Sequence, residues 1–185
     1  MQSIEKRERR TRGGPVCQNQ SGTSEKYSLC GLYSVNNAVQ SRDFLSVEGL
    51  APIVHRLNAA AEEQGTDSHG DVKYGGYSTA ALHEALRAKG YQLRYLNKTS
   101  TFNCSAKKWF KKLALSKVKH LIIIGRGSGQ KEGTWHCIAR AEVGEKFYFI
   151  DSDEFDYKPS TEAGLRHFFA EMSGIYAVEA IKSSE

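Results

Sequence analysis

The sequence has no run of about 18 apolar residues, the length that a membrane-spanning helix requires. The charged segment 5–12 near its start also lacks the apolar stretch of a signal peptide. We therefore expect a soluble protein that is not inserted in a membrane and is not exported through a signal peptide. Its expected location is the cytoplasm or the nucleus.

Cysteine is scarce, with four residues in a chain of 185: Cys17, Cys30, Cys104 and Cys137. Four scattered cysteines do not make a disulfide framework, and no two of them have the C-x-x-C spacing of a zinc site. A reducing compartment is therefore expected, with no metal ion and no other cofactor. Cys104 and Cys137 are predicted to be packing residues, because strand alternation points Cys137 away from its neighbour His136.

The chain divides into a tail and one domain. Residues 1–24 are polar, basic and almost free of apolar side chains, which predicts a disordered tail. Residues 25–182 carry a continuous apolar pattern of the length of one domain, without an internal repeat. The tail and the net charge of +5 raise nucleic acid as an alternative partner. Because Glu5 and Glu8 interrupt the basic cluster and no aromatic residue interleaves it, nucleic acid is not a predicted partner.

Apolar periodicity predicts an α+β fold. The expected helices lie near residues 29–40, 46–63, 78–89, 105–115 and 161–172, and the expected strands near 91–97, 119–125, 134–141, 146–151 and 174–181. The glycine-rich stretch 65–76 is predicted to be a mobile loop between two helices, in a position to act as a lid. The stretch 125–129 is predicted to be a flexible connection.

Cys30 is the first candidate for chemistry. Ser28 is a predicted N-cap, and apolar residues follow it at helical spacing: Leu29, Leu32, Val35, Ala38 and Val39. Cys30 then lies in the first turn of a helix, where free N–H groups and the helix dipole favour the thiolate that a cysteine nucleophile requires. The alternative is a small buried hydrophobe, which is the usual role of a free cysteine.

Two partners for this thiol lie on a predicted hairpin. Residues 134–151 contain two runs rich in aromatic and β-branched residues with a turn between them. If the hairpin is symmetric about Val143 and Gly144, His136 stands opposite Asp151, and the carboxylate can orient the imidazole. The alternative is an ordinary sheet histidine and an aspartate that begins a turn. A loop one residue longer or shorter would put the two side chains on opposite faces.

These residues resemble those of a known family. A cysteine that opens a helix, followed by a histidine and an aspartate on adjacent strands, is the papain-like arrangement. The string Ser28-Leu29-Cys30, followed by Asn36-Asn37 and Gln40, resembles the catalytic helix of Josephin domains, which are ubiquitin-specific cysteine proteases. Trp135-His136, with Asp151-Ser152 fifteen residues further on, resembles their His and Asn/Asp strands. Segment 44–50 is similar to the family's entry into a helical hairpin, and segment 77–97 is similar to the helix and strand that come next.

The resemblance covers about residues 25–181. It implies a papain-like fold of the Josephin type, with a catalytic helix and a helical hairpin packed on an antiparallel β-sheet. It also implies a monomeric, thiol-dependent deubiquitinase that cleaves at the C-terminal glycine of ubiquitin or polyubiquitin, with Cys30 as nucleophile, His136 as base and Asp151 as its orienting group. The alternatives are a weakly active or inactive ubiquitin-binding module of the same fold, and a papain-like or transglutaminase-like enzyme that acts on another protein.

Glu25 departs from the family pattern. The family has a Gln five residues before the nucleophile, whose amide donates to the oxyanion, and this chain has Glu25 there. An ionised carboxylate has no proton to donate and repels an oxyanion. Three alternatives follow: the backbone N–H of Cys30 carries the stabilisation, Gln18 or Gln20 supplies the donor, or the enzyme is slow. Glu25 could also be a surface residue in a shifted register.

Overall fold

The computed structural model describes residues 15, 29–72, 74–96, 110–111, 118–127, 135–152 and 157–181. Within these residues one antiparallel sheet has the spatial order β1-β6-β2-β3-β4-β5. Its strands are β1 (Tyr91–Tyr95), β2 (Leu121–Gly127), β3 (Trp135–Val143), β4 (Lys146–Asp151), β5 (Tyr157–Pro159) and β6 (Phe169–Ala180). The predicted α+β class and the antiparallel sheet are confirmed.

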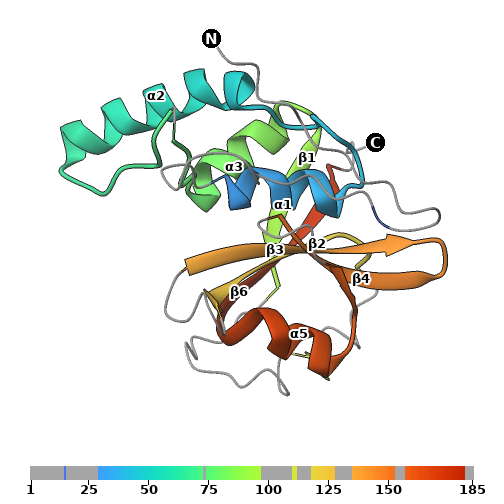
Figure 1. Ribbon diagram of the computed structural model, residues 1–185. Helices are drawn as coiled ribbons and strands as arrows, with labels where there is room; N and C mark the ends of the chain where they lie inside the picture. The colour runs from blue at the N-terminus through green and yellow to red at the C-terminus, as the bar shows by residue number, and fades with distance from the viewer. Residues whose placement is uncertain are drawn as a thin grey trace, which may run out of the picture.

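Helices cover both faces of this sheet (Figure 1). The described helices are α1 (Cys30–Ala38), α2 (Val47–Gln64), α3 (Thr79–Arg87) and α5 (Glu162–Phe168). The helix α1 lies mainly over β3, α3 packs on β1, and α2 packs on α3 as an outer arm. The helix α5 lies on the opposite face. The predicted helical hairpin is thus α2 and α3.

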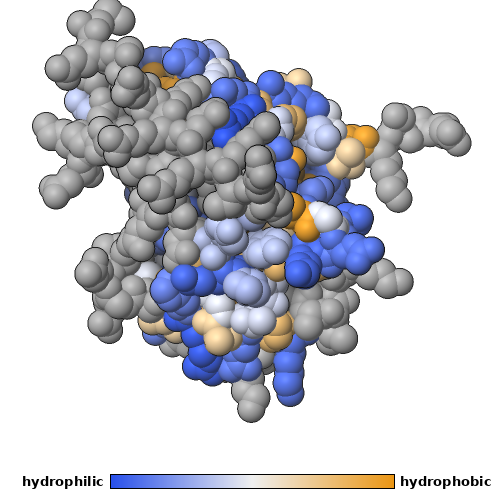
Figure 2. All heavy atoms as spheres, turned by 45° about the vertical axis from the view of Figure 1, so that its right-hand side comes forward, coloured by the Kyte–Doolittle hydropathy of each residue, from blue (hydrophilic) through white to orange (hydrophobic). Residues whose placement is uncertain are grey.

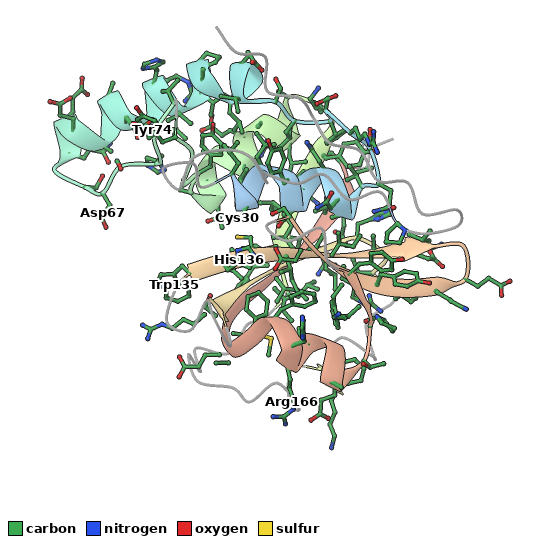
Figure 3. All side chains as sticks on the ribbon, viewed as in Figure 1. Cys30, Asp67, Tyr74, Trp135, His136 and Arg166 are labelled. Carbon is green, nitrogen blue, oxygen red and sulfur yellow. The ribbon has the colours of Figure 1, made fainter. Side chains whose placement is uncertain are left out.

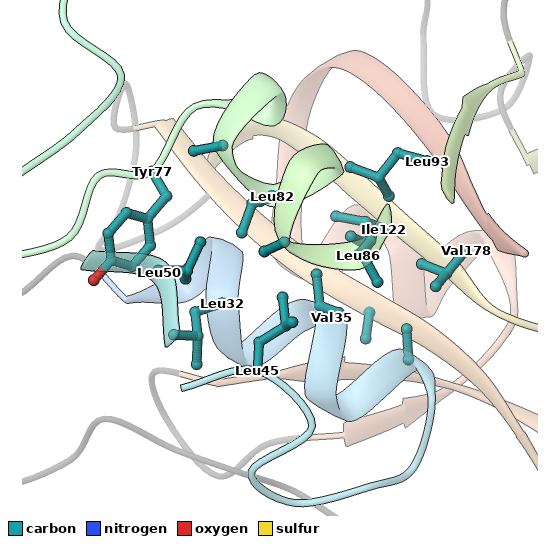
Figure 4. Close-up of a cluster of buried hydrophobic side chains, with 14 of the residues drawn as sticks. Leu32, Val35, Leu45, Leu50, Tyr77, Leu82, Leu86, Leu93, Ile122 and Val178 are labelled. Carbon is teal, nitrogen blue, oxygen red and sulfur yellow. The ribbon is translucent and has the colours of Figure 1, made fainter. Parts of the chain in front are cut away.

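Among the residues that the structure describes, two apolar clusters hold these layers together. The first joins α1, α2 and α3 to one face of the sheet through side chains such as Leu32, Val35, Leu50, Leu82 and Leu86 (Figure 4). The second joins α5 to the other face through Leu121, Ile123, Ile138, Phe149, Leu165, Phe168 and Phe169. Burial of a large apolar side chain contributes about 1.5–3 kcal/mol, so each face fixes the sheet against its own helices.

Three of the described helices begin at a side-chain cap that the sequence encodes. The hydroxyl oxygens of Ser46, Ser78 and Thr161 accept hydrogen bonds from backbone N–H groups three residues later, at 3.1, 3.2 and 3.0 Å. Each bond satisfies one of the N–H groups that a helix start leaves without a partner. The predicted helices 46–63 and 78–89 therefore agree with α2 and α3 to within two residues.

Asn36 ties α1 to the loop that follows it. Its side-chain amide donates to the carbonyl of Leu45 at 2.9 Å, and its carbonyl oxygen accepts from the N–H of Leu45 at 2.8 Å. Both residues are buried, so this pair of bonds fixes where the chain turns from α1 toward α2. The first Asn of the Asn-Asn pair therefore has a structural role.

We expect Asn36→Ala to lower the free energy of unfolding by about 2–4 kcal/mol, because it leaves the N–H and C=O of Leu45 buried without these partners. Urea unfolding followed by circular dichroism measures the loss. Gln64→Ala, at the exposed end of α2, is the control and should change stability by less than about 0.5 kcal/mol. Equal effects of the two substitutions would show that the Asn36 bonds do not stabilise the fold.

The C-terminal prediction was wrong in its boundaries. The helix expected over 161–172 ends at Phe168, and the strand expected from residue 174 begins at Phe169. The cause is pairing: β6 continues along β2 as far as Gly127 opposite Phe169, so sheet hydrogen bonds replace the end of the helix. The short strand β5 was not predicted. Of the helix expected over 105–115, only residues 110 and 111 are described, and both are helical.

Gly125 shows why the glycine-rich stretch after residue 124 is partly a strand. The expected flexible connection over 125–129 was wrong for its first three residues, which belong to β2, and residues 128 and 129 lie outside the described part. A Cβ on Gly125 would lie 2.3 Å from the carbonyl oxygen of Glu171. Only glycine permits this approach of β6, where the register shifts in a β-bulge.

The β3–β4 hairpin has a register different from the predicted one. Val143 pairs with Lys146 around Gly144 and Glu145, and Asp151 stands opposite Ile138 instead of His136. Gly144 has a φ of 63°, which suits the first position of a two-residue turn. The pairing thus moves by two residues. Since side chains alternate with a period of two, the shift leaves His136 and Asp151 on the same face as diagonal neighbours.

Candidate active site

Cys30 is the first residue of α1, so its thiol lies in the first turn of a helix, as predicted. Leu29 occupies the N-cap position and forms no side-chain cap. The prediction that Ser28 is the N-cap was therefore wrong, and Ser28 itself lies outside the described residues. The first N–H groups of a helix have no partner within the helix, and the positive end of its dipole favours an anion. This placement favours a thiolate at Cys30.

Close packing holds the start of α1 in place. Gly31 is buried, and a Cβ on it would lie 3.2 Å from Leu82 of α3 and 3.7 Å from the carbonyl oxygen of Tyr77. One turn further, Leu32 and Val35 belong to the core cluster. The helix that carries Cys30 is therefore clamped between α3 and the sheet.

His136 and Asp151 form a buried pair. The His136 Nε2 lies 2.8 Å from the Asp151 Oδ1, and the two side chains are only 5% and 4% exposed. A carboxylate accepts hydrogen bonds, so the ring donates through Nε2–H. This bond assigns Nδ1 as the ring nitrogen that can accept a proton from Cys30. The pair therefore supplies an oriented base.

Several groups converge on the sulfur of Cys30. The pKa of Cys30 is held well below its ordinary value of 9.0, first by a hydrogen bond from the Cys137 side chain and further by hydrogen bonding and charge from His136 and by the backbone N–H of Cys137. Burial acts in the opposite direction, but the donors outweigh it. Among the described residues, the thiol of Cys30 interacts with the imidazole of His136, which is in turn hydrogen-bonded to the carboxylate of Asp151. This is the arrangement of nucleophilic cysteine catalysis.

We expect the lowered pKa of Cys30 to appear as alkylation that persists at neutral pH. Only the thiolate reacts with iodoacetamide, so an ordinary thiol reacts about 25–50-fold more slowly at pH 7 than at pH 9. In the folded protein, the ratio of the Cys30 alkylation rate at pH 9 to that at pH 7 should be much smaller. In protein unfolded by urea, the same ratio should equal that of an ordinary thiol. Peptide-resolved mass spectrometry measures both. Equal ratios in the two states would contradict a stabilised thiolate.

An exposed aromatic ring borders the site. Trp135, immediately before His136, is 59% exposed, and the Arg126 guanidinium lies 5.3 Å from the centre of its ring. Figure 3 places Trp135 at the end of β3, on the same side of the molecule as Cys30 and His136. A molecule that reaches Cys30 from this end of the sheet would meet the Trp135 ring.

The loop between α2 and α3 is held by specific hydrogen bonds. Asn58 of α2 donates to the carbonyl of Gly70 at 2.9 Å and accepts from the N–H of His69 at 2.7 Å. Asp71 and Gly75 exchange two backbone hydrogen bonds, at 2.7 and 2.9 Å. At the end of this loop, the carbonyl oxygen of Tyr77 lies beside Gly31 of α1. The described part of the expected lid thus has a defined conformation next to the nucleophile, and its mobility stays a prediction.

The structure brings together Cys30, His136 and Asp151, the three residues predicted to be catalytic. Glu25, Gln18 and Gln20, the candidates for the oxyanion donor, lie outside the described residues, as do Cys17 and Cys104. Cys137 was assigned only a packing role, and its hydrogen bond to Cys30 was missed. Strand alternation pointed Cys137 away from His136, but no sequence signal placed the helix of Cys30 on that face.

The fold and this site define an α+β protein with a thiol, an imidazole and a carboxylate brought together. The chain matches no protein-family model and none of the curated proteins compared with it. None of the described helices is long and apolar enough to cross a membrane. On the face in Figure 2, the described surface is mainly hydrophilic, with hydrophobic residues in small separate patches.

Proposed function

We propose that this protein is a thiol-dependent hydrolase of the deubiquitinase class, which cleaves bonds at the C-terminal glycine of ubiquitin. The observation that carries the proposal is the buried hydrogen bond between His136 and Asp151 beside a Cys30 whose pKa is lowered. A purely structural role for His136 would explain its hydrogen bond to Asp151 but not the lowered pKa of the Cys30 thiol beside it. The cysteine at a helix start, followed by Asn36 and Asn37, supports the Josephin resemblance, and this resemblance supports ubiquitin as the substrate.

In the proposed first step, the Cys30 thiolate attacks the carbonyl carbon of the glycine and forms a tetrahedral oxyanion. The bond between this carbon and the leaving amine then breaks, and the protonated His136 gives its proton to the amine. The product is a thioester between Cys30 and the ubiquitin glycine. Asp151 keeps the imidazole oriented and offsets its positive charge.

In the second step, His136 accepts a proton from a water molecule that attacks the thioester. The carbon–sulfur bond breaks, and the products are the free carboxylate of ubiquitin and the Cys30 thiolate. Ubiquitin ends in two glycines, so a narrow passage to Cys30 would admit its tail and exclude larger side chains. The α2–α3 loop is positioned to form one wall of such a passage through Tyr77, which lies against Gly31.

Hydrolysis of a fluorogenic ubiquitin conjugate tests the proposal. A peptide that carries only the Arg-Gly-Gly end of ubiquitin with the same fluorophore is the matched substrate, and Cys30→Ala is the matched enzyme control. We expect release from intact ubiquitin at least about 100-fold faster, in kcat/KM, than release from the peptide, because binding energy from remote surfaces contributes to catalysis. Cys30→Ala should release nothing from either.

Other results would assign the protein to a different class. Equal release from the peptide and from ubiquitin would indicate a peptidase that acts on another protein. Binding of ubiquitin without release would indicate a ubiquitin-binding module. Release by Cys30→Ala at the wild-type rate would overturn the assignment of the nucleophile.

Glu25→Gln tests the position at which the sequence departs from the family. If this side chain faces the oxyanion, glutamine supplies an N–H donor and removes a repulsive charge. One such donor is worth about 10²–10³ in kcat, and backbone donors reduce the gain, so we expect a rise of about tenfold or more. A rate and pH profile equal to those of the wild type would place Glu25 outside the oxyanion hole and leave Gln18 and Gln20 as candidates.

A further inference from the structure

A second thiol lies beside the nucleophile. Cys30 and Cys137 are both thiols outside any disulfide and both are half-buried, one at the start of α1 and the other near the start of β3. Cys137 packs against the core cluster that contains Leu32 and Val35 of α1. It therefore projects from the face of the sheet that α1 covers, toward the helix that begins with Cys30.

The sulfur of Cys30 contacts β3 at its edge. Successive side chains of a strand point to opposite faces, yet this sulfur has hydrogen bonds with both His136 and Cys137. The described β3–β4 pairing ends at Ile138 opposite Asp151, so β4 does not pair with the two residues before Ile138. Where this described pairing ends, a sulfur can reach side chains from both faces and the backbone N–H of Cys137.

We propose that Cys137 is a positioning residue of the active site, whose thiol and backbone N–H donate hydrogen bonds to the Cys30 sulfur and hold it as a thiolate at the edge of β3. The consequence for catalysis rests on the proposed function, whereas the effect on the sulfur does not. Since Cys30 is partly buried, desolvation alone would favour the neutral thiol. Donors from Cys137 offset this cost without adding a second charge.

The alternative role for Cys137 is packing alone. A half-buried cysteine behaves as a small hydrophobe, and valine is close to it in size and suits a strand. Valine keeps the apolar contact with α1 but has no side-chain donor. Serine keeps a donor and loses apolar character. The two variants therefore separate hydrogen bonding from packing.

The test is the alkylation rate of Cys30 by iodoacetamide from pH 5.5 to 9.5 in the full chain, resolved by peptide mass spectrometry. The wild type is compared with Cys137→Val and Cys137→Ser, and the Cys17 and Cys104 peptides of each digest are internal references. For each protein, the rate of Cys30 alkylation at pH 6.5 is divided by its rate at pH 9.5. This ratio should be lower in Cys137→Val than in the wild type by a factor of about five or more. Cys137→Ser should retain the wild-type profile.

A Cys137→Val profile that coincides with the wild type in a folded protein would overturn the proposal, because packing would then suffice. A Cys137→Ser profile that shifts as far as that of Cys137→Val would also overturn it. Circular dichroism checks that both variants are folded; if Cys137→Val does not fold, Cys137→Ala takes its place as the variant without a donor. The alkylation assay contains no ubiquitin, so it tests the role of Cys137 even if the protein is not a deubiquitinase. Likewise, a failure of the Cys137 proposal does not affect the ubiquitin assays.

Discussion

His136→Ala should reduce kcat/KM for a fluorogenic ubiquitin conjugate by about 10³–10⁴-fold, the largest loss of any substitution outside Cys30. The imidazole has two roles in the proposed reaction. It contributes to the low pKa of Cys30 through hydrogen bonding and charge, and it supplies the proton for the leaving amine. Alanine removes both and offers no group in their place.

The matched control is His55→Ala, which removes an exposed histidine of α2. It should leave kcat/KM within twofold of the wild type. Thermal unfolding of both variants checks that the loss is not caused by unfolding. A His136→Ala enzyme with more than a tenth of the wild-type kcat/KM would show that the base is another group.

Asp151→Ala should reduce kcat/KM by about 10²-fold, less than His136→Ala, because the thiolate still has the donors of Cys137 and the helix start. The substitution leaves the Nε2–H of a buried His136 without its acceptor, so the ring loses its orientation. Asp151→Asn keeps an oxygen that can accept this hydrogen bond but removes the charge that offsets the imidazolium. We therefore expect it to retain about tenfold more activity than Asp151→Ala.

Glu145→Ala removes an exposed carboxylate of the β3–β4 turn and is the control for charge alone. It should retain the wild-type kcat/KM. The order wild type, Asp151→Asn, Asp151→Ala is the decisive result. Equal activity of the wild type and Asp151→Ala would mean that Asp151 does not orient the base, even though the two side chains are hydrogen-bonded.

The candidate site could be predicted because its three side chains follow from local patterns. A helical period after residue 28 places Cys30 in a first turn, and two β-rich runs place His136 and Asp151 on neighbouring strands. The register of the hairpin was predicted incorrectly by two residues, since a turn of Gly144 and Glu145 replaced the expected centre. An error of two preserves the face, whereas an error of one would have separated His136 from Asp151.

Long-range pairing explains what the sequence analysis missed. The end of the predicted helix over 161–172 is apolar and periodic, but residues from Phe169 onward pair with β2, which the local pattern does not contain. The bond between Cys137 and Cys30 has the same origin. Strand alternation gave the correct direction of Cys137 relative to His136, but which helix lies on that face depends on residues more than 100 positions away in the chain.

Capture by ubiquitin that carries a C-terminal propargylamide tests the central claim most directly. This probe bonds only to a nucleophilic thiol placed at the C-terminus of bound ubiquitin. We predict that intact-protein mass spectrometry will find one ubiquitin added to the wild type, peptide mapping will locate it on Cys30, and Cys30→Ala will remain unmodified. A wild-type protein that stays unmodified, or an adduct on a cysteine other than Cys30, would contradict the claim that His136 and Asp151 activate Cys30 toward ubiquitin.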